Sequence, residues 1–67
     1  MLSARNHFKG TIKSVKLGNV MAEVVLTVGK LEVVSVITRE SATHMKLKVG
    51  DRATAVIKST AVMVSKG

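Results

Sequence analysis

Apolar residues recur at every second position along much of this chain, and this alternation restricts it to a β fold. The pattern is clearest over 20–28 and 31–38. Successive side chains of a strand point to opposite faces, so a period of two gathers the apolar ones on one face. Between the two segments, Gly29 comes first in a two-residue connection, as a type II′ turn prefers. The sequence therefore predicts a β-hairpin over 20–38.

The rest of the chain adds three strands to this hairpin. Residues 6–16 also alternate, but their apolar positions change parity near Lys13, which indicates a β-bulge and a bend. The pattern returns over 52–58 and, after a polar break at 58–60, over 61–65. The sequence therefore predicts five strands.

Residues 39–46 lack alternation and predict a short helix. Thr38 is suited to be its N-cap, and Ala42 and Met45 are expected to face inward. A helix between strands 3 and 4 favours a small Greek-key barrel of the OB type. We therefore predict an all-β fold, a five-stranded Greek-key OB-type barrel with one short helix, forming a single domain over 1–67.

The apolar content exceeds what so short a chain can bury alone. A domain of this length buries only about 60% of its unfolded surface. Yet 46% of the 67 residues are hydrophobic, and both faces of the predicted strands 20–28 and 31–38 carry Val, Leu or Met. There is no cysteine to stabilise the fold by disulfides. The sequence therefore predicts a homo-oligomer in which subunits cover one another's apolar faces.

No segment resembles a signal peptide or a membrane span. Arg5 and Lys9 interrupt the N-terminal region, and no apolar run approaches the length of about 18 residues that a spanning helix needs. We expect a soluble, cytoplasmic protein without a membrane partner.

The charge is strongly positive, with 11 Lys and Arg against 4 acidic residues and a formal charge of +7. This favours anionic partners, although a solubilising lysine surface has the same composition. Nucleic acid is one such partner, and an OB-type module that binds single strands non-specifically is the alternative function. Such modules stack bases on aromatic side chains, and Phe8 is the only aromatic residue.

Catalysis is not expected, and neither is coordination of a metal ion. The carboxylates are scattered, and His7 and His44 lack the spaced partners that a zinc site requires. No phosphate-binding loop or nucleophile elbow is present. The sequence predicts no catalytic residue and no bound cofactor.

Hydrogen-bond donors gather at two places near the chain ends. Ser3 and Arg5 form one cluster, and Lys58 and Ser59 the other. A site made of donors suits a fully deprotonated oxyanion, and Thr38 at a helix N-terminus would add free N–H groups. The plainer alternative is that these residues are a simple cap, a solvated strand end and ordinary turn chemistry.

Three stretches carry a resemblance to a known family: SARNHFKGTI at 3–12, VSVITRESATHMKLKVGD at 34–51 and ATAVIKSTAVMV at 53–64. Together they resemble the molbindin (Mop) domain, the small molybdate-binding OB-type unit of the TOBE group. The resemblance implies a cytoplasmic protein that binds molybdate, and usually tungstate, for molybdenum storage or homeostasis. It also implies a hexamer, built as a trimer of dimers, with the oxyanions at subunit interfaces.

The same resemblance implies which residues bind the oxyanion. They match the N-terminal, mid-chain and C-terminal ligand positions of the family, with backbone N–H groups contributed by the residues next to Arg5. The set is Ser3, Ala4, Arg5, Asn6, Thr38, Ser41, Lys58 and Ser59. Molybdenum would be bound only as the oxyanion, not as a coordinated metal ion.

Overall fold

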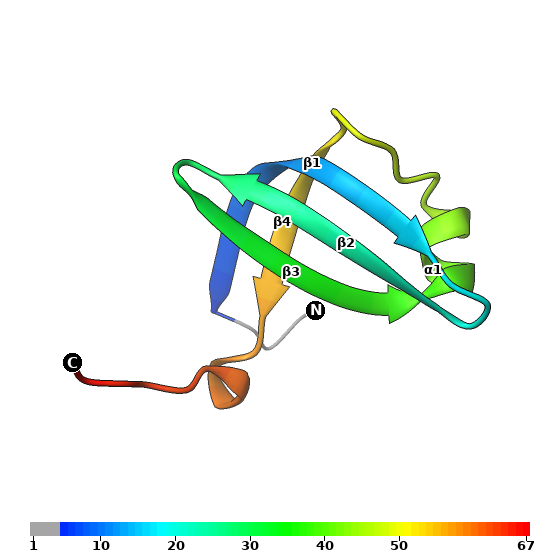
Figure 1. Cartoon of the computed structure of the whole chain (residues 1–67). Helices are drawn as coiled ribbons and strands as arrows, with labels where there is room; N and C mark the ends of the chain where they lie inside the picture. The colour runs from blue at the N-terminus through cyan, green and yellow to red at the C-terminus, as the bar shows by residue number, and fades with distance from the viewer. Residues whose placement is uncertain (1–4) are drawn as a thin grey trace.

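The computed structural model describes residues 5–67, which form one antiparallel sheet with a short helix at one end (Figure 1). The sheet has four strands in the order β3-β2-β1-β4. In chain order the elements are β1 (Asn6–Leu17), β2 (Met21–Val28), β3 (Leu31–Thr38), α1 (Arg39–His44), β4 (Arg52–Ile57) and the 3₁₀ turn η1 (Ser59–Ala61).

The long strand β1 organises the sheet because its two halves pair with different neighbours. Its first half pairs with β4, from Asn6 opposite Ile57 to Thr11 opposite Arg52. Its second half pairs with β2, beginning where Thr11 lies opposite Thr27. The register shifts between Ile12 and Ser14, which confirms the predicted bulge. Bulges increase local twist and bending, and Figure 1 shows β4 crossing behind β2 and β3.

Gly10 allows β1 and β2 to approach closely at the point where β1 changes partner. A Cβ atom on Gly10 would lie 2.5 Å from the backbone oxygen of Thr27 and 2.9 Å from Cγ2 of Val28. Both distances are shorter than non-bonded carbon contacts allow, since those are favourable at about 3.5–4.0 Å. Glycine at this strand position therefore serves the close approach of two backbones.

The core lies on the inner face of the curled sheet. Ile12, Val24, Leu26 and Ala55 form its buried cluster, and Leu47, after the helix, packs against it half-buried. Ile12, Val24 and Leu26 come from the alternating positions that the sequence identified in β1 and β2. At the tip of the following hairpin, Gly29 has a φ of 59°, the sign that a type II′ turn requires at its first central residue.

The helix begins as predicted but ends earlier. Thr38 is the N-cap, and its Oγ1 accepts a hydrogen bond from the Ser41 N–H at 3.0 Å. Ala42 faces inward and is 2% exposed, whereas the prediction for Met45 is wrong, because this side chain is 56% exposed.

The reason for the Met45 error is a C-terminal cap that reverses the chain. The Leu47 N–H donates to the Ala42 carbonyl at 3.2 Å, and the Lys46 N–H donates to the Thr43 carbonyl at 3.0 Å. Lys46 has a φ of 54°, so these bonds form a Schellman motif with a left-handed residue after the cap. The reversal turns Leu47 against the core, whereas Met45 lines the open apolar hollow beside it and stays exposed.

The predicted fifth strand is also wrong for this chain taken by itself. Residues 59–61 form a 3₁₀ turn, and the structure has no strand within 62–67. The turn directs the C-terminal segment away from the sheet, as Figure 1 shows, and a strand needs a neighbour to accept and donate its backbone hydrogen bonds. Met63 and Val64 are consequently 94% and 93% exposed. Among the described residues, no helix is long and apolar enough to cross a membrane.

Candidate functional site

Pairing between β1 and β4 brings the two terminal donor clusters together. Asn6 lies opposite Ile57, and its Nδ2 donates a hydrogen bond to the Ile57 carbonyl at 3.3 Å. Arg5 directly precedes Asn6 and Lys58 directly follows Ile57, so the two cations flank the last pair of the ladder. Residues 51 positions apart in sequence thus meet at one end of the sheet. We call this group of Arg5, Asn6, Lys58 and Ser59 the terminal cluster.

Three side chains of the terminal cluster can face a ligand, whereas Asn6 is held by its bond to the Ile57 carbonyl. Arg5, Lys58 and Ser59 are exposed. Lys58 is the N-cap of η1 but makes no side-chain capping bond. Within residues 5–67 the only salt bridge joins Lys13 to Glu32, so neither cation of the cluster is neutralised by a carboxylate there. The cluster therefore presents positive charge and N–H and O–H groups to whatever binds it. The predicted ligands Ser3 and Ala4 lie outside the described residues.

The mid-chain pair, Thr38 and Ser41, has a different environment. Thr38 Oγ1 accepts from the Ser41 N–H and donates to Ser41 Oγ at 2.8 Å. The Thr38 hydroxyl thus caps α1, and the Ser41 hydroxyl accepts a hydrogen bond from it. Thr38 lines an open hollow of about 580 Å³ at the helix start, but Arg39 and Glu40 line it together, so the hollow has no net positive charge from these residues to favour an anion. In a single chain, the capping role fully accounts for this pair.

The two groups lie at opposite ends of β1. Asn6 begins the strand, whereas Thr38 pairs with Met21, just beyond the Leu17–Ala22 pair that ends it. β1 has 12 residues, so its two ends are well separated even though the bulge bends it. One chain therefore does not bring all the predicted ligands to a single point, and a site that uses both groups requires a second copy.

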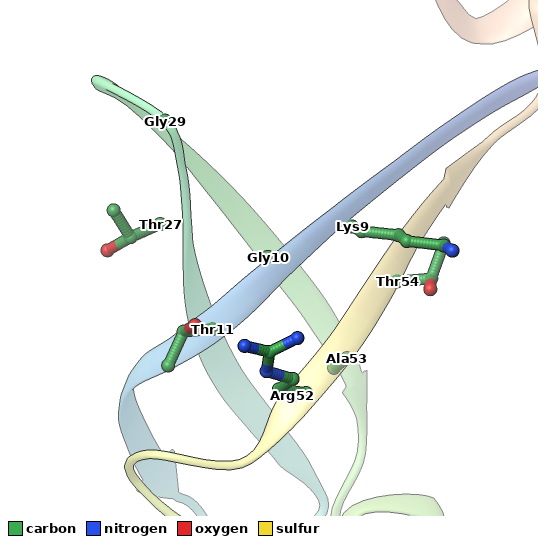
Figure 2. Close-up of a pocket in the computed structure, with 8 residues that line it drawn as sticks. All are labelled: Lys9, Gly10, Thr11, Thr27, Gly29, Arg52, Ala53 and Thr54. Carbon is green, nitrogen blue, oxygen red and sulfur yellow. The ribbon is translucent and has the colours of Figure 1, made fainter.

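Sequence reasoning missed a further cationic hollow, of about 350 Å³, on the outer face of the sheet. Lys9 and Thr11 of β1 line it beside Arg52 and Thr54 of β4 (Figure 2). Alternation alone places Lys9 and Thr11 on one face of β1, and Arg52 and Thr54 on one face of β4. Only the pairing of β1 with β4 shows that all four lie on the same face of the sheet.

Three comparisons connect the chain to known proteins. The family model of the TOBE domain matches residues 2–64. Molybdenum-pterin-binding protein 3 of Clostridium pasteurianum is 48% identical over 64 residues, which cover 94% of each chain. The high-resolution structure of a molybdate binding protein from Sporomusa ovata matches with a TM-score of 0.94 at 36% identity, covering 98% of both chains.

A longer structure contains the same fold as one part. The cytoplasmic molybdate-binding protein ModG, crystallised with molybdate bound, matches with a TM-score of 0.83 at 43% identity. The match covers 88% of this chain and 43% of that one. The likeness to these structures covers most of this chain in both cases, so the fold is shared with proteins of both lengths.

Proposed function

The chain belongs to the TOBE domain family, among its small molybdenum-pterin-binding (Mop) members, and on this premise we propose that it binds molybdate reversibly and without chemical change. The observation that carries the proposal is the terminal cluster, in which Arg5 and Lys58 meet with no carboxylate paired to either within the described residues. The function is binding rather than catalysis.

The charge of the terminal cluster fits a small dianion. An anion removed from water needs charge-assisted hydrogen bonds to offset the loss of its hydration. A guanidinium and an ammonium supply two positive charges, and the Ser59 hydroxyl and nearby backbone N–H groups supply further donors. Molybdate carries no proton near neutral pH, so it needs no acceptor in return. Tungstate has the same charge and shape, and we expect it to bind as well.

We place the complete site between subunits. The terminal cluster of one copy would meet Thr38 and Ser41 of another, which explains how ligands at opposite ends of β1 act together. The exposed apolar surface supports assembly, since Val34 and Val36 on the outer face of β3 are 61% and 60% exposed. The proposed assembly is a hexamer, a trimer of dimers, in which the domain formed by 1–67 is the repeating unit.

Assembly would also supply the missing strand. The sheet ends at β3 and β4, so each has an unpaired edge. An apolar hollow of about 480 Å³ lies between these edges, lined by 33–37 and 53–57. We propose that 62–65 of a neighbouring copy enters this hollow as the fifth strand. It would complete a five-stranded Greek-key barrel of the OB type and bury the apolar side chains of 62–65 that face the hollow.

The proposed role is storage and buffering of molybdate in the cytoplasm. The description of the similar protein ModG as cytoplasmic supports this compartment. A buffering protein needs reversible binding of the intact oxyanion, which a site of hydrogen bonds and charges provides and covalent or redox chemistry does not.

The alternative, a non-specific binder of single-stranded nucleic acid, has less support. Phe8 is the only aromatic residue, and it lies opposite the buried Ala55. This places it on the inner face of β1, whereas the cation Lys9 lies on the outer one. Base stacking and phosphate contacts would therefore fall on different faces of the strand.

Isothermal titration of the whole protein tests the proposed function. Molybdate and tungstate should bind tightly, and sulfate and phosphate much more weakly. Native mass spectrometry of the same sample should show a hexamer carrying the oxyanion, and Met63→Asp should reduce it to smaller species. Equal affinity for sulfate contradicts the proposed selectivity. Salt-dependent oligonucleotide binding without molybdate binding favours the alternative instead.

A further inference from the structure

The outer hollow on β1 and β4 combines two cations with hydroxyl groups at positions set by the register of the two strands. Lys9 lies opposite Thr54, and Thr11 lies opposite Arg52. Opposite residues of an antiparallel pair share a face, as do residues two apart on one strand. These four side chains therefore form a rectangle on the outer face, with the two cations on one diagonal and the two hydroxyls on the other. On β2, Thr27 lies opposite Thr11 and adds a third hydroxyl residue to the lining.

The hollow exists because β1 changes partner at this point. Thr11 is the last residue paired with β4 and the first paired with β2, so the β2–β3 hairpin and β4 diverge on either side of it. Gly10 has no side chain to fill the gap that opens. Figure 2 shows the hairpin tip at Gly29 on one side of β1 and β4 on the other, with the Arg52 guanidinium between Thr11 and Ala53.

The positive charge of the hollow is not cancelled by nearby acids. No acidic residue lines it. Glu32, which lies opposite Thr27, forms the ion pair with Lys13. Asp51, next to Arg52, accepts a hydrogen bond from the Lys48 N–H at 3.1 Å, which occupies it in the preceding turn. The hollow therefore attracts an anion independently of the terminal cluster.

The size and groups of the hollow indicate the class of anion. Its volume of about 350 Å³ lies within the range of roughly 300–1,000 Å³ typical of sites for small organic ligands. A guanidinium binds two oxygens of a phosphate side by side, and an ammonium adds a point charge. Threonine hydroxyls both donate and accept, which suits a phosphate ester that is partly protonated near its second pKa of about 6.

We propose that this hollow, lined by Lys9, Thr11, Thr27, Arg52 and Thr54, binds the phosphate group of a small organic phosphate monoester. Arg52 and Lys9 hold the phosphate oxygens, and the organic part lies toward Thr27 and Gly29, where the lining carries no charge. This site is separate from the terminal cluster. Its occupancy does not depend on the proposed binding of molybdate.

Titration with phenyl phosphate, followed by calorimetry and by amide chemical shifts, tests this proposal on the full chain. Binding should move the amide signals of 9–11 and 52–54. The double variant Lys9→Gln/Arg52→Gln should lose at least tenfold in affinity, and Arg52→Lys should lose less because it keeps the charge but not the planar fork. Lys16→Gln is the matched control for Lys9→Gln. Lys16 is on the same strand but outside the hollow, so its loss should change affinity less than twofold.

Three further arms separate the possible sources of binding. Phenol should not bind, and inorganic phosphate should bind more weakly than phenyl phosphate. Molybdate affinity should be unchanged in the double variant, whereas Lys58→Ala should leave phenyl phosphate binding intact. The proposal is overturned if Lys16→Gln costs as much as the double variant, if phenol binds equally well, or if the shifted amides lie elsewhere. Tighter binding of an oligonucleotide than of phenyl phosphate at the same amides also overturns it.

Discussion

Polar residues gather near both ends of β1, but the two groups have different roles. At the helix end, the Thr38 hydroxyl accepts from the Ser41 N–H and donates to the Ser41 hydroxyl, so it stabilises α1 within the chain. At the other end, Arg5 and Lys58 flank the last β1–β4 pair without a carboxylate partner among the described residues. A polar group already satisfied inside the chain contributes mainly to stability. A charged pair that lacks a counter-ion is suited to bind one.

The largest expected effect concerns the terminal cluster. Lys58→Ala should weaken molybdate binding by about a hundredfold or more, because the dianion loses one of two compensating charges. In the wild-type protein, a hundredfold excess of molybdate over its dissociation constant should stabilise the assembly by roughly 2.7 kcal/mol. A thermal melt with and without molybdate measures this, and the shift should vanish in the variant.

Lys66→Ala is the matched control for that experiment, since it removes the same charge from the exposed C-terminal segment. It should keep the full molybdate-induced shift. Arg5→Ala should behave like Lys58→Ala and leave the empty protein as stable as before. If Lys58→Ala retained the full shift, Lys58 would be only a solvated strand end, and the contrast between the two ends of β1 would be lost.

A smaller effect is expected where the two halves of β1 join. Gly10→Ala should destabilise the protein by about 1–3 kcal/mol, because the new methyl group must displace the backbone of Thr27 rather than a flexible side chain. Urea unfolding measures the free energy change. Thr11→Ala, one residue further on an exposed face, should cost much less. Equal costs at the two positions would show that the close approach of β1 and β2 is not required.

The smallest effect is expected at the helix end. Thr38→Ala removes the N-cap and should cost about 1 kcal/mol of unfolding free energy in the absence of molybdate. Thr38→Ser keeps the hydroxyl and should recover most of it. Molybdate affinity in the same two variants sharpens the contrast. If Thr38 also binds the oxyanion in the assembly, Thr38→Ala should lower the molybdate affinity as well as the stability.

Much of the secondary structure followed from local patterns. The hairpin at Gly29, the bulge after Ile12 and the cap at Thr38 each depend on residues close together in sequence, and each prediction was confirmed. The inward position of Met45 was predicted wrongly because helical spacing gives no information about where the helix stops. The left-handed residue Lys46 is not a glycine, so no local signal predicted the reversal that brings Leu47 inward.

The candidate site was predictable in part. The donor-rich residues at each chain end were visible in the sequence, and the resemblance to the Mop family joined them into one expected ligand set. The register of the strands was needed to show that Arg5 and Lys58 flank one pair of the ladder. It was also needed to show that Thr38 lies at the far end of β1. The hollow around Lys9 and Arg52 was missed for the same reason.

The sequence by itself determined which segments are strands, where they turn and which face of each is apolar, because backbone preferences and side-chain alternation act between neighbouring residues. Only the tertiary structure decided which strand faces lie together. Pairing depends on partners far apart in the chain, and a shift of one residue would exchange the two faces. The same dependence explains the C-terminal segment, where the strand pattern is present in 61–65 but, within the described residues, no strand pairs with it.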